Sequence, residues 1–545
     1  MNYVVGDFET TPEGLLSYGG VKILGDTDRN IFVSLDQMFS YFTEGRYIIY
    51  FHNLSRFDGV FILDWLTQNA TYVEKFTRKA KEFTTIFTDM GNIVRIKYFV
   101  NRNLKFEFRC SKLMWVDSLD NIGKALNLSV RKGRIDYSKI TNYNSIFQIP
   151  KDFLEYLHND LDLLEGLVLH LLNNDLTKTL PLTQSSLAIK TLKEFIGEDN
   201  YKYYFKNKIS TTDWDFIKEA YWGGFSYVNP KFKQYIINKK IYYHDVNSSY
   251  SSSMKDSLMP YGYPSKTQPK NTTFTYWEKR YISYCKLKEG CIPYIHSGKS
   301  AFKSIEYVVE DTMLVRTYNI DEWEYIESIY EIEYEAIERL YFKTAPIFKE
   351  YMEYAKQFKE NATNITDRQH AKIMLNATYG KFGQNRVIKS KTWNGENWIT
   401  KEEVKTKDLS YIPVAAYTTA KSRLLLHYRI NEYKEDFIYS DTDSLVLFTK
   451  MDDKHLHPTE FGKWDLETYG NKAFFNKAKN YAIVNHKGEH MIKIAGLRTS
   501  DNMTFEDYLN NDTYAHLKKK KVINGLKLVL SPFINDIIVK GVINE

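Results

Sequence analysis

The segment 439–444, which reads Tyr-Ser-Asp-Thr-Asp-Ser, places the carboxylates of Asp441 and Asp443 in one short turn. Apolar residues rich in β-formers flank it at 436–439 and 445–448, so we expect a tight β-hairpin. Two acids held this close repel each other, and they either raise a pKa or recruit a cation. Such a pair of carboxylates can bind a hard divalent cation, which prefers oxygen ligands and commonly assists phosphate chemistry. An ordinary surface turn is the alternative, because Asp and Ser favour turns.

Four further carboxylates lie in the first third of the sequence, together with a phenol. Asp7 and Glu9 are two residues apart on a predicted strand, so both side chains face the same side of a sheet. Asp58 follows an apolar strand at 47–51 and stands where a helix of about 59–69 begins. A strand-end Asp is often only a helix cap, so its role depends on the other acids.

Tyr156 and Asp160 complete this group on a predicted helix at 152–172. They are four residues apart, which places them on one helix face, although Tyr156 could also belong to the core. Four acids together can hold two divalent metal ions roughly 3.5–4 Å apart. The sequence therefore predicts a second acidic site, formed by elements that are far apart in the chain.

The order of these residues resembles the three motifs of the DEDD-type 3′→5′ exonucleases that are attached to family B DNA polymerases. The resemblance implies that Tyr156 orients the attacking water and that four acids bind the metal ions, namely Asp7, Glu9, Asp58 and Asp160. It also assigns residues that hold a single-stranded DNA end by hydrogen bonds and stacking. In this motif, one more residue separates Asn53 from Phe57 than in some relatives. These residues are Asn53, Phe57, Ser118, Leu119 and, as a catalytic phosphate contact, Lys132.

A third acid joins Asp441 and Asp443 from the middle of the sequence. Asp245 ends a predicted strand, and the backbone amides that follow it can meet a triphosphate. The segment resembles the family B motif Asp-x-x-Ser-Leu-Tyr-Pro, with Ser249 and Ser251 at the Leu and Pro positions. The resemblance implies two metal ions on the aspartates and a tyrosine that leaves no room for a 2′-hydroxyl. The metal ligands are then Asp245, Val246 and Asp443, and the nucleotide contacts are Ser248 and Tyr250.

A predicted helical pair at about 349–381 carries a polar stripe. Spacings of four, four and three place the stripe on one helix face, whereas Ile373, Met374 and Leu375 lie off it. The segment 372–381 resembles the fingers motif Lys-x-x-x-Asn-Ser-x-Tyr-Gly. The resemblance implies that two cations neutralise triphosphate charge and that the Asn and Tyr line the nascent base pair. The stripe consists of Arg368, Lys372, Asn376 and Tyr379.

Three shorter segments resemble DNA-contacting motifs of family B polymerases. Paired glycines at 223–224 allow close backbone approach to a phosphate chain, and they resemble the Tyr-x-Gly-Gly motif that links exonuclease to polymerase. A predicted helix at 413–431 carries a Thr-x-x-x-Arg pattern, and 479–481 resembles the Lys-x-Tyr motif at the primer terminus. The residues assigned to DNA are Tyr221, Gly223, Gly224, Thr419, Arg423, Lys479 and Tyr481. Four lysines at 518–521, before alternating residues up to 542, favour a small basic β thumb.

Two insertions separate the polymerase motifs. The first is rich in tyrosine, and the second predicts a hairpin with Asn394 and Gly395 at its turn. Insertions at these places are typical of protein-primed family B polymerases, where the first docks a terminal protein and the second helps to enclose DNA and split the downstream duplex. The predicted domains are 1–178 (exonuclease), 179–256 (palm), 257–348 (first insertion), 349–386 (fingers), 387–411 (second insertion), 412–496 (palm) and 497–545 (thumb).

The composition is that of a globular protein with several domains, since 43% of the 545 residues are hydrophobic and 26% are charged. A net charge of +6 permits a nucleic-acid partner without requiring one. Three cysteines in no metal or disulfide pattern fit a reducing compartment. No apolar run approaches the roughly 20 residues of a membrane span, and we expect no signal or transit peptide. A cytoplasmic protein is expected, in the host cell if the source is viral.

The motifs predict a mixed α/β and α+β multidomain protein, with a ribonuclease H-like exonuclease domain and a right-hand polymerase of palm, fingers and thumb. The resemblance covers the whole chain and implies a protein-primed DNA polymerase that uses deoxynucleoside triphosphates, displaces a strand and proofreads. It implies two Mg²⁺ ions at each site, with Mn²⁺ as an alternative, and a DNA template-primer and a terminal protein as partners. We expect a monomer or a heterodimer with that protein. The alternatives are a DNA-primed polymerase of the same family, a nuclease-only repair protein, and an RNA-directed enzyme or primase.

Overall fold

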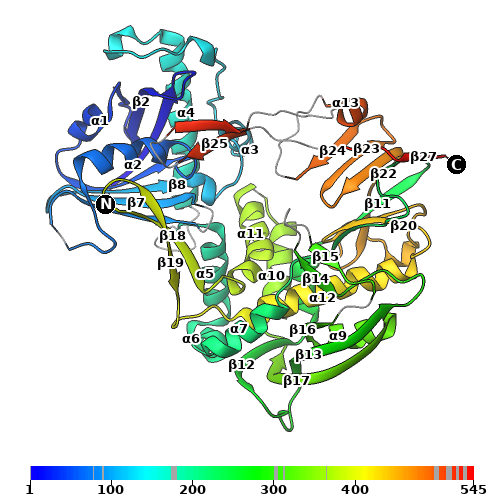
Figure 1. Ribbon diagram of the computed structural model, residues 1–545. Helices are drawn as coiled ribbons and strands as arrows, with labels where there is room; N and C mark the ends of the chain where they lie inside the picture. Colours follow the sequence, from blue (N-terminus) through cyan, green and yellow to red (C-terminus); the bar gives the residue numbers. More distant parts are fainter. Residues whose placement is uncertain are drawn as a thin grey trace.

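The computed structural model describes residues 2–77, 79–88, 91–173, 181–299, 305–310, 313–363, 365–495, 503–510, 518–522, 527–531 and 537–544. Figure 1 shows a first domain (blue) on one side and a large sheet built partly from the last strands (orange) on the other. Two helices, α10 (Lys349–Glu360) and α11 (Ile365–Phe382), lie between them. Among the described residues, no helix combines the length and the apolar character that a membrane span requires.

An eight-stranded sheet forms the centre of the first domain, in the order β3-β2-β1-β4-β8-β7-β6-β5. Its strands are β1 (Asn2–Thr10), β2 (Leu16–Ile23), β3 (Asn30–Phe32), β4 (Gly45–Phe51), β5 (Thr71–Tyr72), β6 (Glu82–Phe87), β7 (Ile93–Phe99) and β8 (Leu104–Cys110). Its helices are α1 (Leu35–Tyr41), α2 (Asp58–Asn69), α3 (Leu119–Ala125) and α4 (Lys151–Asn173). Side chains alternate along a strand, so Val4 packs in the apolar cluster that contains Ile62 of α2, and Val5 in the cluster that contains Leu161 of α4. Helices therefore cover both faces.

A nine-stranded sheet forms the palm, with the path β24-β23-β22-β11-β21-β20-β9 and with β10 paired to β22 and β27. Its strands are β9 (Ser226–Val228), β10 (Tyr235–Asn238), β11 (Ile241–Val246), β20 (Phe437–Asp441), β21 (Ser444–Leu447), β22 (Trp464–Lys477), β23 (Asn480–Asn485), β24 (His490–Ile494) and β27 (Gly541–Asn544). The adjoining helices are α5 (Gln184–Ile196), α6 (Glu198–Phe205), α7 (Thr211–Ala220), α8 (Ser249–Asp256) and α12 (Ile412–Glu432). The first half of the central helix α12 is fully buried, whereas Tyr428 near its end is exposed.

The first insertion folds as a separate four-stranded sheet in the order β12-β17-β13-β16. Its elements are β12 (Met259–Ser265), β13 (Phe274–Leu287), β14 (His296–Lys299), β15 (Ile305–Tyr307), β16 (Leu314–Asn319), α9 (Ile320–Ile329) and β17 (Tyr330–Ala345). Helix α9 begins with a capping box formed by Asn319 and Glu322. The helix packs between this sheet and α12, so the insertion is joined closely to the palm.

The second insertion is the predicted hairpin, with β18 (Val387–Trp393) and β19 (Trp398–Val404). Its turn includes Gly395 at a φ of 105°, a conformation that favours glycine. The hairpin extends from the fingers to the first domain (Figure 1), where Trp398 is buried against Tyr72 and Phe87. Lys401 adds an ion pair to Glu74 at 2.5 Å. The hairpin therefore bridges the two halves of the molecule.

The last part of the chain differs from the predicted thumb at one point. The described elements are α13 (Phe505–Asn510), β25 (Lys518–Val522), β26 (Lys527–Ser531) and β27. The first two strands pair as a hairpin, but β27 pairs in parallel with β10 and so belongs to the palm sheet. The segments 523–526 and 532–536 of the predicted alternating region lie outside the described residues, as do the side chains of the four-lysine run.

Candidate active sites

The three aspartates of the polymerase motifs converge at one end of the palm sheet. Asp245 lies on β11 opposite Ser444 of β21, and Asp441 lies on β20 opposite the same serine. The turn is fastened to β11, because the Asp443 carbonyl accepts the Val246 N–H at 2.8 Å. The Asp443 N–H also donates to the Asp441 carbonyl at 2.7 Å. Three carboxylates that are scattered along the sequence therefore meet, as predicted.

The pKa values of these carboxyls reflect their crowding. Desolvation and the charge of Asp443 raise the pKa of Asp245 to about 7. Desolvation and the charge of Asp441 raise the pKa of Asp443. Two acids that sequence reasoning missed, Glu467 and Asp465 on β22, add to the repulsion on Asp245. A divalent cation with oxygen ligands relieves such repulsion, so these residues fit a metal site.

The two serines that depart from the family B motif have a structural role. The hydroxyls of Ser249 and Ser422 are 2.6 Å apart, which joins α8 to α12. Ser251 donates to the Leu375 carbonyl at 2.8 Å, which joins α8 to α11. Both serines are buried. Ser248 starts α8 from a left-handed conformation with a φ of 53°, and this turns the chain sharply after the strand that carries Asp245.

The predicted nucleotide contacts lie on two facing helices. The rings of Tyr250 on α8 and Tyr379 on α11 have centroids 4.2 Å apart. Arg368, Lys372 and Asn376 are exposed, while the three apolar residues between them are buried. The polar stripe of α11 is therefore turned outward, as its spacing predicted.

One cation beside this stripe was not predicted. The pKa of Lys359 on α10 is lowered by partial burial and then by the charges of Lys372 and Arg368. The mutual repulsion shows that three positive charges from two helices share one region. An anion of high charge, such as a triphosphate, would relieve it. The sequence signal was weak, because Lys359 belongs to a helix with several other lysines.

The acids of the first domain form a second cluster. Asp7, Glu9 and Asp160 each offer an oxygen within 4.8 Å of the other two. Desolvation and the charge of Asp160 raise the pKa of Glu9 to about 8, and Asp58 at the start of α2 adds to this rise. One oxygen of Asp160 accepts a hydrogen bond from Lys132 at 2.7 Å, while the other is buried without a hydrogen-bond partner among the described residues. A buried, unpartnered carboxylate oxygen fits a metal ligand.

Tyr156 stands beside this cluster on α4. Its hydroxyl is 2.7 Å from that of Tyr137, a partner that sequence reasoning missed although it lies in the same short motif as Lys132. The Lys132 ammonium lies 5.0 Å from the centre of the Tyr156 ring. Lys132 therefore contacts both an acid and the phenol, and its pairing with Asp160 competes with the expected phosphate contact.

The residues assigned to a single-stranded end fall into two groups. Asn53 and Phe57 are half-buried in the loop before α2, where the Asn53 carbonyl accepts the Phe57 N–H at 2.9 Å. Ser118 caps α3 by accepting the Asn121 N–H at 3.2 Å, and Leu119 is buried in the core beneath it. A direct DNA contact by Leu119 does not fit this position, because its side chain packs inside the domain.

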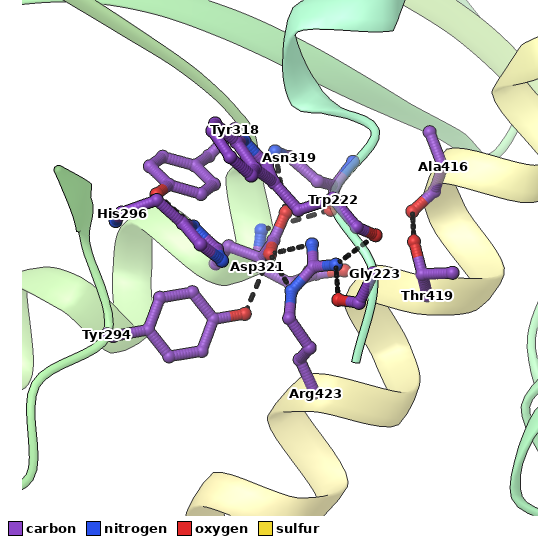
Figure 2. A network of polar contacts seen from close by, with 11 residues as sticks. Trp222, Gly223, Tyr294, His296, Tyr318, Asn319, Asp321, Ala416, Thr419 and Arg423 are labelled. Atoms are coloured by element: carbon purple, nitrogen blue, oxygen red, sulfur yellow. Dashed lines mark hydrogen bonds and ion pairs between the residues drawn. The ribbon is translucent and has the colours of Figure 1, made fainter. Parts of the chain in front are cut away.

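The expected DNA contacts of Thr419 and Arg423 also need correction. Both side chains are buried on α12. Thr419 donates to the Ala416 carbonyl at 3.1 Å, and Arg423 donates to the carbonyls of Trp222 and Gly223 at 2.8 and 3.0 Å (Figure 2). Their polar atoms are thus used inside the protein. Arg423 holds the glycine-rich linker (221–225), whereas Thr419 bonds within its own helix, and both side chains are too deeply buried to touch DNA.

The remaining predicted contacts lie near the turn formed by Asp441, Thr442 and Asp443. Tyr221 and Gly224 belong to the glycine-rich linker, and Gly224 packs directly on Thr442. The Lys479 ammonium is 3.3 Å from the Asp441 carboxylate and is half-exposed, so it can reach a ligand. Tyr481 is largely buried beside the ring of Tyr439. The linker and the Lys-x-Tyr segment therefore both contact the turn that carries Asp441 and Asp443.

Known proteins are similar to this chain over most of its length. The family described as DNA polymerase type B, organellar and viral, matches residues 40–152 and 144–460. The DNA polymerase of Bacillus phage phi29 is 29% identical over 509 residues, which are 87% of this chain and 85% of that protein. The DNA polymerase of Streptococcus phage Cp-1 is 26% identical over 584 residues, which are 97% of each protein.

Solved structures have the same fold. The phi29 DNA polymerase complexed with primer-template DNA and incoming nucleotide substrates has a TM-score of 0.87 and 25% identity, over 98% of this chain and 100% of that one. The same polymerase complexed with single-stranded DNA has a TM-score of 0.85 at 25% identity, over 98% and 99%. These matches confirm the predicted fold class and the predicted DNA polymerase. The chain belongs to the type B DNA polymerases of organelles and viruses.

Proposed function

We propose that this polymerase starts replication on a protein primer, extends the product by strand displacement, and removes errors with its own 3′→5′ exonuclease. The observation that carries polymerisation is the convergence of Asp245, Asp441 and Asp443 at one end of the palm sheet. The primer hydroxyl attacks the α-phosphate of a deoxynucleoside triphosphate, and pyrophosphate leaves.

The residues around the aspartates bind different parts of the metal–nucleotide complex. Asp245, Asp443 and the Val246 carbonyl are the proposed ligands of two Mg²⁺ ions, with Mn²⁺ as an alternative. Bound there, Mg²⁺ stabilises charge on the attacking oxygen and on the reacting phosphate. The fingers cations, Arg368, Lys372 and Lys359, neutralise the triphosphate. Ser248 and the amides beside it contact the phosphates, Tyr250 closes the sugar pocket, and Asn376 with Tyr379 lines the new base pair.

The acidic cluster of the first domain is the proposed editing site. Asp7, Glu9, Asp58 and Asp160 supply the metal ligands, and Tyr156 orients a water towards the terminal phosphodiester. Lys132 contacts Asp160 at 2.7 Å, and its charge opposes the rise that burial causes in the pKa of Asp160. Selection of nucleotides by shape alone is limited, so a second site that hydrolyses errors raises accuracy.

A protein primer is supported by the surface of the first insertion. Tyr281 on β13 lies directly opposite Val315 on β16, and both are exposed. Met313 is also exposed, and its sulfur is 3.4 Å from the Tyr281 hydroxyl. A cluster of exposed apolar side chains marks a protein-docking surface. The insertion would therefore bind a terminal protein whose hydroxyl receives the first nucleotide.

The decisive experiment supplies a template without a DNA primer, one labelled deoxynucleotide, and a small candidate primer protein encoded beside this chain. Transfer of label to that protein supports protein priming, and extension restricted to DNA primers refutes it. Asp441→Ala should abolish incorporation and leave 3′→5′ degradation. Asp7→Ala combined with Asp58→Ala should do the reverse, and loss of both activities in either variant would contradict two independent sites.

A further inference from the structure

The glycine-rich linker runs directly along the turn formed by Asp441, Thr442 and Asp443. Gly224 packs so closely that a Cβ there would lie 2.6 Å from Cγ2 of Thr442. The Phe225 carbonyl accepts the Thr442 N–H at 2.7 Å. Immediately after the linker, the Ser226 hydroxyl donates to the Asp441 carboxylate at 2.5 Å. The position of the linker therefore determines both the backbone of the turn and the orientation of the Asp441 side chain.

A buried guanidinium holds the other side of the linker. Nη1 of Arg423 donates to the carbonyls of Trp222 and Gly223 at 2.8 and 3.0 Å, as Figure 2 shows. The opposite edge of the guanidinium is bound by Glu322, whose Oε1 lies 2.5 Å from Nη2 and 3.2 Å from Nε. The Tyr294 hydroxyl donates to the same carboxylate oxygen at 2.7 Å.

Glu322 belongs to helix α9 of the first insertion and not to the palm. Its second oxygen accepts the Asn319 N–H at 3.2 Å, so its carboxylate is fixed from two directions. The exposed fractions of the Arg423 and Glu322 side chains are 1% and 0%. A charge this deep is stable only when it is paired and hydrogen-bonded. The insertion therefore supplies the counter-charge that keeps Arg423 against the linker.

Only an arginine can make this set of contacts. Its planar fork reaches a carboxylate on one edge and two carbonyls on the other at the same time, whereas a lysine ammonium is a point charge on a flexible stem. The rings of Trp222 and His296 stack with centroids 4.2 Å apart, which adds a second contact between the linker and the insertion. The insertion thus holds the linker at two adjacent places.

We propose that Glu322 is a positioning residue for nucleotide incorporation: through Arg423 it holds the linker carbonyls, and the linker holds Asp441 in place. This deepens the proposed polymerase function and rests on it. The first insertion therefore acts on the catalytic centre indirectly, through Arg423 and the linker. A protein primer that displaces α9 changes the geometry at Asp441.

Two variants, Arg423→Lys and a double variant, separate positioning from folding, and Glu322→Gln tests the ion pair itself. Arg423→Lys keeps the charge next to Glu322 but cannot reach both carbonyls. Glu322→Gln leaves the buried guanidinium without its counter-charge, so it tests the pair at the expense of stability. The double variant Glu322→Gln with Arg423→Met removes both charges at similar volume and leaves the Trp222 and Gly223 carbonyls without the guanidinium, while the stack of Trp222 on His296 remains.

The chain offers a matched control on the same two helices. Asp321, the residue before Glu322, pairs with Lys421 of α12 at 2.6 Å. None of its described hydrogen bonds or ion pairs reaches the linker. Asp321→Asn therefore weakens the contact between the insertion and the palm without releasing the Trp222 and Gly223 carbonyls.

Each full-length variant is tested for Tm, for 3′→5′ degradation of single-stranded DNA, and for single-nucleotide incorporation across a Mg²⁺ titration. We expect Arg423→Lys and the double variant to keep Tm and degradation near wild type, to lower the kcat of incorporation about 10- to 100-fold, and to require more Mg²⁺. Asp321→Asn should change none of these.

Two results overturn the proposal. Wild-type kcat and Mg²⁺ requirement in Arg423→Lys or in the double variant would show that the linker does not depend on the pair. Parallel loss of Tm, degradation and incorporation in both variants would show that the pair serves only the fold. A wild-type enzyme without incorporation would instead refute the polymerase function, so the two failures are distinguishable.

Discussion

Replacing Glu9 by glutamine should stabilise the metal-free protein at alkaline pH. The Glu9 carboxyl is buried beside Asp160, and its pKa is raised from 4.5 to about 8 by desolvation and by that neighbouring charge. Below pH 4.5 the carboxyl is protonated in both the folded and the unfolded state. As the pH rises towards 8, the unfolded state releases this proton and the folded state retains it. Stability is therefore lost progressively across this range.

The size of the effect follows from the same pKa values. A rise from 4.5 to about 8 corresponds to about 5 kcal/mol of stability lost, at about 1.4 kcal/mol for each pH unit. The neighbouring acids share this repulsion, since the pKa values of Asp7 and Asp160 are also raised. Removing one charge returns only part of the loss, on the order of 2 kcal/mol at pH 8.

The assay is thermal unfolding with a chelator at pH 5, 6.5 and 8, combined with amide hydrogen exchange of β1, which reports on this domain alone. Wild type should lose Tm and exchange protection as the pH rises, and Glu9→Gln should lose less. Added Mg²⁺ should raise the Tm of wild type more than that of the variant. Glu155→Gln, on the exposed side of α4, is the control. If Tm fell equally with rising pH in wild type and in Glu9→Gln, that result would refute a cluster of buried carboxylates that repel one another.

Three further predictions concern the polymerase half. Lys359→Ala should raise the KM for deoxynucleotides about 10-fold through loss of a charge-assisted contact. Lys356→Ala on the same helix should leave the KM unchanged. Equal KM values in Lys359→Ala and wild type would show that Lys359 does not contact the nucleotide. Tyr250→Ala should admit ribonucleotides in primer extension, and continued exclusion would show that another group selects the sugar. Deleting 389–409 should impair copying through duplex but not along single strands, and Trp398→Ala should do the same more mildly by releasing the hairpin from Phe87; equal damage to both templates would contradict that role.

The acids of the proposed polymerase site could be found from the sequence because each stands where a locally encoded element ends. Asp245 follows an apolar β-forming run, and Asp441 with Asp443 lies between two such runs. The turn between Asp441 and Asp443 is short, so the β-propensity of the flanking residues and the pairing of the two strands favour the same hairpin. The polar stripe of α11 was visible for the same reason, since a period of 3.6 residues decides which side chains share a face.

The residues that were missed or misplaced depend on what packs against an element. Asp465 faces Asp245 only because β22 pairs with β11 in a particular register, which includes an irregularity between Tyr243 and His244. A Thr-x-x-x-Arg pattern suggested DNA contacts for Thr419 and Arg423, but it could not show that Glu322 of the first insertion binds Arg423 inside the protein. Long-range pairing of this kind has no local signal in a single sequence.

The pairing of β27 with β10 has a consequence for how the protein is made. The palm sheet takes strands from residue 226 onward, and its last strand, Gly541–Asn544, joins Tyr235–Asn238. During translation β10 must wait for some three hundred further residues before this neighbour emerges from the ribosome, with one edge unpaired meanwhile. We expect the nascent palm to need protection by chaperones until then.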